Sequence, residues 1–179
     1  MRYSIIILIL ILQACSSADT YTKKHFFDFE AYIDAEVDRL MGQQIQVQKH
    51  YEFNGAIEDT VITAADWNKE LRPFRIDINK PAWVAHVKID SNTVSFAEYA
   101  IEYTFDSDKI PYRKAIIIYE DAEMSKVLEI LIVYRSDNYL YKAERELIYH
   151  SRDGYQINGV QDVKVLEDAN YLIEAKFIH

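Results

Sequence analysis

The sequence predicts an α+β domain in which one curved antiparallel sheet, of about seven or eight strands, carries helices on one face. Two observations predict this class. Apolar residues recur at helical spacing over residues 26–41, and in most later segments they alternate with polar residues instead. Short turn-type sequences separate these later segments at regular intervals, as expected for sequential antiparallel strands. A sheet of this length is expected to curl, which favours a half-barrel or a cystatin-like layout.

Two helices are expected. In the first, over residues 26–41, Phe29, Ile33 and Val37 follow one another at helical spacing, and acidic side chains occupy the other side. The second is short. Thr63 would cap its N-terminus, and Pro73 would end it.

The other segments predict strands. Residues 45–53 alternate cleanly, and Asn54-Gly55 is a strong hairpin signal that leads into a return strand at 56–62. Further strands are expected near 82–90, 95–105, 112–120, 127–135, 139–150, 155–166 and 171–178. The turn residues between them indicate a meander of antiparallel neighbours.

The N-terminal residues form a separate segment. Arg2 precedes an unbroken aliphatic run from Ile5 to Leu12, which as a helix would span only about 12 Å of a bilayer core that is roughly 30 Å thick. A cleavable export signal fits this length and these flanks. A buried first strand or helix is the alternative, but the run offers neither a polar face nor a cap.

The next residues, Leu12-Gln13-Ala14-Cys15, resemble the lipobox of bacterial lipoproteins, although Gln13 stands where a small residue is common. The resemblance implies cleavage before Cys15, lipidation of its thiol and acylation of the new N-terminus. Because Cys15 is the only cysteine, a lipidated chain has no thiol chemistry and no disulfide. We therefore expect a signal peptide at 1–14, the lipidated cysteine and a flexible tether at 15–24, and a single α+β domain at 25–179.

The same resemblance implies a location in the bacterial cell envelope, with acyl chains at Cys15 as the membrane anchor. Ser16, rather than an aspartate, follows the cysteine, which favours the outer membrane over the inner membrane. The chain has a net charge of −9 and no basic stripe, so nucleic acid is not an expected partner.

Tyrosine is unusually frequent, with fourteen in the chain. Many of them share the parity of the apolar positions in the predicted strands: Tyr51, Tyr99, Tyr103, Tyr119, Tyr134, Tyr139, Tyr141, Tyr149, Tyr155 and Tyr171. A buried phenol needs a hydrogen-bond partner, so these residues could line an amphipathic concavity. The alternative is ordinary packing, with hydroxyl groups that reach water at the sheet edge.

Arg145 sharpens this hypothesis because it shares a strand face with Tyr139, Tyr141 and Tyr149. An arginine in that position must pair with a carboxylate, stack on a ring or line a wet cavity, unless a β-bulge reverses the parity. We therefore predict ligand contacts from Arg145, from these three tyrosines and from Tyr103.

Catalytic patterns were also considered. Glu98 and Glu102 would stand about 13 Å apart on one strand face, too far for a glycosidase pair. Glu144 and Glu146 would be about 6.6 Å apart, within the inverting range, but on the face opposite the tyrosines, where a solvated surface is the better interpretation. The histidines lack metal-site spacing. No enzyme, metal site or cofactor is predicted.

These observations favour a non-enzymatic binding module for an apolar or amphipathic ligand or a partner segment. The layout resembles that of half-barrel lipoprotein-sorting carriers, without a motif match, and predicts a tyrosine-lined cavity of more than about 300 Å³. The alternative is an interaction or scaffold subunit of an envelope complex, which predicts an exposed apolar patch. A hydrolase of cystatin-like layout is the third possibility.

Overall fold

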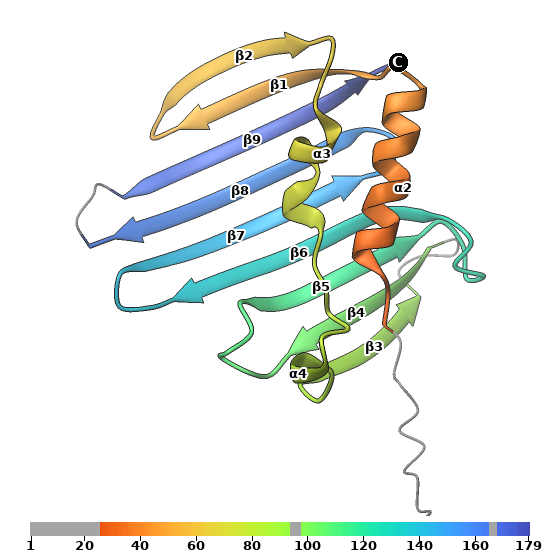
Figure 1. Ribbon diagram of the computed structural model, residues 1–179, viewed down its shortest axis with the longest axis vertical. Helices are drawn as coiled ribbons and strands as arrows, with labels where there is room; N and C mark the ends of the chain where they lie inside the picture. Colours follow the sequence, from red (N-terminus) through yellow and green to blue (C-terminus); the bar gives the residue numbers. More distant parts are fainter. Residues whose placement is uncertain (1–25, 94–97, 165–167) are drawn as a thin grey trace, which may run out of the picture.

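The computed structural model describes residues 26–93, 98–164 and 168–179, and its sheet has nine strands (Figure 1). The helical elements are α2 (Phe29–Gly42), α3 (Trp67–Glu70), the 3-10 helix η1 (Arg72–Phe74) and α4 (Pro81–Val84). The strands are β1 (Gln46–Phe53), β2 (Ala56–Ile62), β3 (Val87–Thr93), β4 (Tyr99–Phe105), β5 (Tyr112–Tyr119), β6 (Val127–Asp137), β7 (Tyr141–His150), β8 (Gly154–Val163) and β9 (Ala169–Ile178).

The strands form one open antiparallel sheet in the order β2-β1-β9-β8-β7-β6-β5-β4-β3. From β3 to β9 each strand pairs with the next one along the chain, which is the predicted meander. The N-terminal hairpin β1-β2 joins the same sheet because β1 pairs with the last strand, from Gln46 opposite Ile178 to Phe53 opposite Tyr171. This pairing of distant segments raises the sheet from the expected seven or eight strands to nine.

Helix α2 overlaps the helix expected over residues 26–41. It begins at Phe29 because Asp28 caps it: the side-chain oxygen accepts a hydrogen bond of 3.0 Å from the backbone N–H of Ala31. Its apolar stripe is buried against the sheet through Phe29, Ile33, Val37 and Leu40. Each of these side chains contributes about 1.5–3 kcal/mol by leaving water.

The second helical segment differs from its prediction. The N-cap is Asp66 and not Thr63, because the Asp66 side chain accepts a hydrogen bond from the backbone N–H of Lys69. Helix α3 therefore starts at Trp67, and Pro73 lies inside η1. A helical turn that was not expected, α4, has Pro81 in its first turn and delays the start of β3 to Val87.

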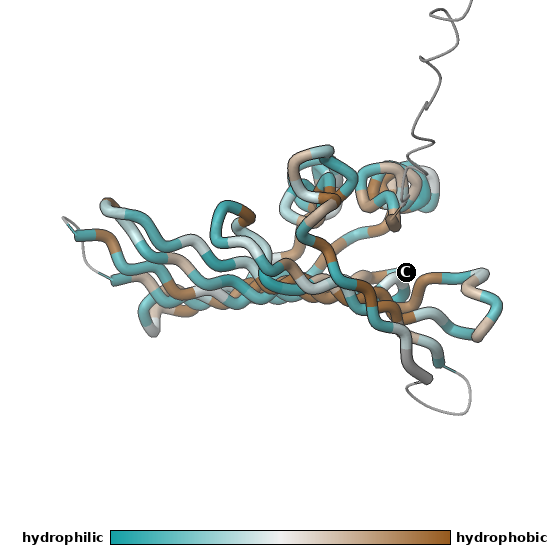
Figure 2. Tube along the Cα trace, turned by 90° about the horizontal axis from the view of Figure 1, so that it is seen from below, coloured by the Kyte–Doolittle hydropathy of each residue, from teal (hydrophilic) through white to brown (hydrophobic). Residues whose placement is uncertain are grey.

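The helices lie on one face of the sheet, which we call the helix face (Figure 2). The main core lies between them and the sheet, where Ile117, Ile132 and Leu147 meet Phe74 and Ile78. Over the residues described, no helix covers the other face, which we call the open face. No helix of these residues is long and apolar enough to cross a membrane.

Candidate functional site

The predicted binding residues are divided between core and surface. Tyr149 and Tyr103 are buried in the core, with 0% and 4% exposure, whereas Tyr139 is 81% exposed. Tyr141 and Arg145 are half-buried on β7, and the Arg145 charge acts on the Tyr141 hydroxyl. The structure therefore brings Arg145 and Tyr141 together and leaves the other three elsewhere. The predicted lipidation site, Cys15, lies outside the described residues.

Arg145 belongs to a straight row of side chains that crosses the helix face from β1 to β5. Each member of this row lies directly opposite the next member on the neighbouring strand. We call it the aromatic row, and its members in order are Phe53, Tyr171, Gly159, Arg145, Tyr134 and Tyr112. In Figure 1 the ends of β8 and β9 that lie far from α2 have no helix over them, so part of this face is uncovered.

On the β5 side of Arg145 the row is packed ring against ring. The guanidinium carbon lies 5.3 Å from the centroid of the Tyr134 ring, within cation–π range. Tyr134 contacts Tyr112 edge-on at 5.7 Å, and Tyr112 contacts Trp83 of α4 in the same way at 5.8 Å. Arg145 therefore lies at one end of a continuous series of aromatic contacts.

On the β9 side of Arg145 the row has a gap in its side chains, which Gly159 provides. The end of the Tyr171 ring fills the space above this glycine. A Cβ atom on Gly159 would lie only 2.4 Å from Tyr171 Cζ and 2.5 Å from its hydroxyl oxygen. The phenol end of Tyr171 therefore lies directly over the residue that neighbours Arg145.

Arg145 lacks the carboxylate partner that most other arginines of the described residues have, and the exposed Arg72 is the other exception. In the described part of the chain Arg39, Arg75, Arg113, Arg135 and Arg152 each pair with an acidic side chain. Arg145 Nε is buried and has no hydrogen-bond partner there, although the residue as a whole is only half-buried. Leaving a buried polar group without a partner costs about 1–3 kcal/mol.

Hydroxyl groups gather next to this guanidinium. Ser136 Oγ donates to the Tyr141 hydroxyl at 3.5 Å. Hydrogen bonding with Ser136 and with Tyr134 lowers the pKa of Tyr141, and the Arg145 charge lowers it further. Burial raises the pKa of Tyr134, and the Arg145 charge opposes that shift. The arrangement therefore offers one positive charge and several hydroxyl donors at a partly exposed position.

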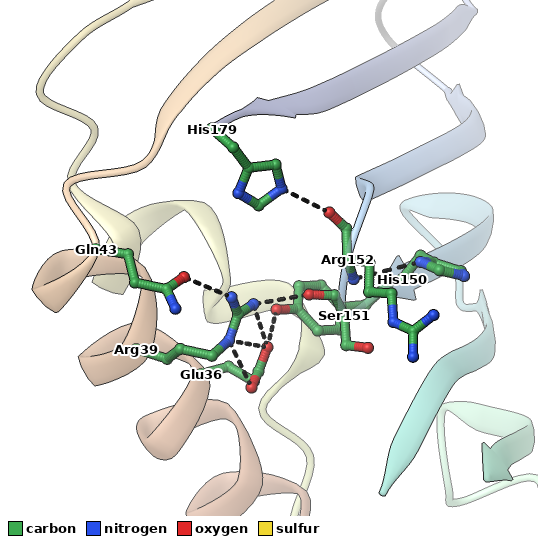
Figure 3. A network of polar contacts seen from close by, with 8 residues as sticks. Glu36, Arg39, Gln43, His150, Ser151, Arg152 and His179 are labelled. Atoms are coloured by element: carbon green, nitrogen blue, oxygen red, sulfur yellow. Dashed lines mark hydrogen bonds and ion pairs between the residues drawn. The ribbon is translucent and has the colours of Figure 1, made fainter. Parts of the chain in front are cut away.

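A second polar cluster links α2 to the sheet (Figure 3). The Tyr149 hydroxyl donates to Glu36 Oε2 at 2.5 Å, and Arg39 Nη2 donates to the same oxygen at 2.8 Å. Arg39 Nη2 also donates to the backbone carbonyl of Ser151 at 2.7 Å. Burial raises the pKa of Tyr149 strongly, and the Glu36 charge adds to this shift. Because Glu36 neutralises Arg39, this cluster holds the helix in place and offers no free charge.

A third cluster repeats this pattern under α3. Glu70 Oε2 accepts hydrogen bonds from the Tyr155 hydroxyl and from Lys49 Nζ, the latter at 2.5 Å. The Lys49 side chain is only 6% exposed. Lys49 was missed as a functional position, yet it shares the strand parity of Val47 and Tyr51. A charged residue at an apolar position is the same signal that singled out Arg145.

The cluster of Figure 3 also contains a nucleophile type of side chain: Ser151 Oγ is buried without a hydrogen-bond partner among the described residues. His150 Nδ1 lies 3.1 Å from Asp153, and His179 Nε2 donates to the Arg152 carbonyl at 3.2 Å. Neither contact joins a histidine to the Ser151 hydroxyl, as a nucleophile and its base would require.

The predicted outer-face carboxylates lie on the solvated side of the sheet, next to a surface hollow. Glu144 is exposed and pairs with Arg135 at 3.2 Å, as expected for a solvated surface. A surface hollow of about 390 Å³ is bordered by Glu144, Glu146, Arg145 and Tyr134, but not by the other tyrosines expected to line a cavity. Over the ranges described, no group of three or more His, Cys, Asp or Glu side chains could hold a metal ion.

Comparison with known proteins finds no matching family model, no matching curated protein and no matching solved structure.

Proposed function

We propose that this chain is a lipid-anchored cell-envelope protein that acts as a non-enzymatic binding module for an apolar or amphipathic ligand. The ligand lies on the uncovered part of the helix face, along the aromatic row. The alternative occupant of the same surface is an apolar segment of a partner protein.

One observation carries the proposal: Arg145 is half-buried beside the Tyr134 ring and has no carboxylate partner among the described residues. Its neighbours toward β1 are amphipathic or apolar, since Tyr171 is half-buried and Phe53 is 56% exposed. A surface that combines apolar side chains with a few placed polar or charged groups, as this row does, is typical of a binding site.

Native mass spectrometry of residues 16–179 tests the proposal. Removing residues 1–15 deletes none of the described fold, which begins at residue 26. We expect a copurifying mass of lipid size that is released by denaturing extraction and is lost when Arg145 or Tyr141 is replaced by alanine. A cooperatively folded protein with only its own mass would contradict the proposal.

The anchor is supported by the resemblance of residues 12–15 to a lipobox and by the apolar run before them. The expected location is the outer membrane in preference to the inner membrane. In a bacterial host the full chain should fractionate with membranes, and Cys15→Ser should leave it unprocessed and without acyl chains. Intact-mass analysis that finds no acyl chain on the wild-type protein would rule the anchor out.

A specific observation also favours the second candidate, an interaction or scaffold subunit of an envelope complex. On the open face Ile116, Leu131 and Ile148 lie directly opposite one another on β5, β6 and β7. They are half-buried and no described helix covers them. Chemical crosslinking in cells should then yield a partner with the wild type that is lost with Leu131→Glu. The same partner captured by both proteins would exclude this surface.

At the level of fold we propose a half-barrel or cystatin-like layout, which is supported by one long antiparallel sheet with its helices on a single face. An experimental structure of residues 16–179 would test the curvature directly.

A further inference from the structure

We propose that the ligand is an anionic amphiphile whose carboxylate binds Arg145 and whose apolar chain runs over Tyr171 toward Phe53. This inference rests on the proposed function and specifies the ligand chemistry of the same site.

The first support is the positive charge of Arg145. A guanidinium without a carboxylate partner is unusual in a chain whose net charge is −9. The residues directly opposite Arg145 are Tyr134 and Gly159, neither of which is acidic. Its chain neighbours Glu144 and Glu146 lie on the open face, since alternate residues of a strand point to opposite faces. The residues directly opposite Arg145 therefore supply no negative charge to its guanidinium.

The number of charges selects the class of anion. Arg145 supplies a single positive charge, and its planar fork matches the two oxygens of a carboxylate. No second cation accompanies it among its directly opposed neighbours, so a doubly charged phosphate monoester would be left partly uncompensated. Carboxylates are also the partners of two other cations on this face. Glu36 of α2 pairs with Arg39, and Glu70 of α3 pairs with Lys49.

The hydroxyl groups complete the site. Ser136 of β6 and Tyr141 of β7 form a hydrogen-bonded pair further along the strands from Arg145, and the phenol end of Tyr171 lies on its β8 side, over Gly159. A carboxylate held by the outer edge of the guanidinium can accept further hydrogen bonds from such groups. Hydrogen bonds to charged groups are about twice as strong as neutral ones.

The direction of the apolar chain follows from packing. Toward β5 the row is closed, because Tyr134, Tyr112 and Trp83 contact one another in sequence. Toward β1 it passes Gly159 to Tyr171 and then to the exposed Phe53. These three strand spacings cover about 14 Å. The chain can extend only over this open part of the row.

The test compares three probes with the same twelve-carbon chain: laurate, methyl laurate and dodecyl phosphate. Each is titrated calorimetrically into residues 16–179 below its micelle concentration. We expect laurate to bind at least tenfold more tightly than methyl laurate and more tightly than dodecyl phosphate. In Arg145→Gln the laurate affinity should fall to that of the ester. The matched control is Arg72→Gln, which removes an exposed arginine and should leave all three affinities unchanged.

The outcomes separate this inference from the proposed function. Equal binding of laurate and methyl laurate by the wild type would overturn the inference and leave an apolar binding module. Tighter binding of dodecyl phosphate would overturn the carboxylate assignment. Absence of binding by all three probes would overturn both proposals. If Arg145→Gln does not fold, Arg145→Lys serves instead, since it keeps the charge but loses the fork, and it should still lower the laurate affinity.

Discussion

The sheet carries two aromatic regions on the same face, and they differ in whether their cations have carboxylate partners. Under α2 and α3, Tyr149 and Tyr155 lie directly opposite each other, and each donates to a glutamate that a helix supplies. Each glutamate in turn pairs with a cation, Arg39 or Lys49. In the uncovered region, Arg145 lies beside Tyr134 with no carboxylate among the described residues.

The difference shows what the helices contribute besides apolar surface. In the covered region they deliver the carboxylates that make buried phenols and cations tolerable. In the uncovered region the same types of side chain occur without a helix, and the carboxylate must come from elsewhere. We infer that the covered region serves stability and that the uncovered region serves binding.

The largest expected effect is on the covered side. Glu70→Ala leaves the Lys49 charge buried with no partner, which should lower the free energy of unfolding by about 3–5 kcal/mol. Urea titration measures this loss. Glu58→Ala, which removes an exposed glutamate on β2, is the control and should change it by less than about 0.5 kcal/mol. A loss below about 1 kcal/mol for Glu70→Ala would contradict the stabilising role assigned to the buried Lys49–Glu70 pair.

Alkaline pH should distinguish Tyr149 of the covered region from Tyr141 of the uncovered region, because their pKa values shift in opposite directions. Burial raises the pKa of Tyr149 above its ordinary value of 10.0. Below pH 10 this tyrosine is therefore neutral in both the folded and the unfolded state, and its contribution to stability is fully present. Above pH 10 the unfolded state loses the proton first, and stability should fall by about 1.4 kcal/mol per pH unit for this tyrosine. The pKa of Tyr141 is lowered, so its contribution has the opposite sign and is lost as pH falls.

Urea unfolding between pH 9 and pH 11 measures these slopes. Tyr149→Phe should make the fall above pH 10 shallower, whereas Tyr141→Phe should not. Identical slopes in the two variants would contradict the opposite pKa shifts of Tyr149 and Tyr141.

A smaller effect on stability is expected at Gly159. In Gly159→Ala the new Cβ would overlap the end of the Tyr171 ring, and this half-buried ring can swing outward at a cost of about 1 kcal/mol or less. Laurate affinity should nevertheless fall, because the phenol no longer lies beside Arg145. Gly42→Ala, where nothing lies within 4 Å of the added atom, is the control for both measurements. Unchanged laurate affinity in Gly159→Ala would exclude Tyr171 from the site.

The smallest effect is expected from removing one hydroxyl. Tyr141→Phe should weaken laurate binding about three- to tenfold, the value of one hydrogen bond, and leave the unfolding free energy at pH 7 within about 0.5 kcal/mol of the wild type. Calorimetry and urea titration on the same samples check both values. A loss of stability without a loss of affinity would show that Tyr141 supports the fold, as Tyr149 and Tyr155 do, and does not contact the ligand.

Local patterns predicted much of this architecture. Helical spacing located α2, and alternation with turn residues located the meander from β3 to β9. The pairing of β1 with β9 joins residues more than a hundred positions apart, and nothing local in either segment specifies it. Asp66 caps α3 in place of Thr63, and because either residue type can cap a helix, the sequence alone does not choose between them.

The candidate site was predictable only in part. Arg145 and Lys49 both occupy apolar strand positions, so the sequence marks them as unusual in the same way. The two residues differ in their partners. Lys49 pairs with Glu70 of α3, and this contact depends on how the helix packs on the sheet. Tyr103 and Tyr149 were expected beside Arg145 because parity gives the face of a strand but not the part of that face a helix covers.

The most direct measurement is the free energy of unfolding of Arg145→Met compared with Arg39→Met, each without ligand. Methionine keeps the apolar stem and removes the charge. If Arg145 serves binding, its removal relieves an unpartnered buried Nε, and the variant should be as stable as the wild type or more stable. Arg39→Met should lose about 2–3 kcal/mol, because Glu36 loses its cation and the Ser151 carbonyl loses its donor. An equal loss in both variants would show that Arg145 is a structural residue and would contradict the account.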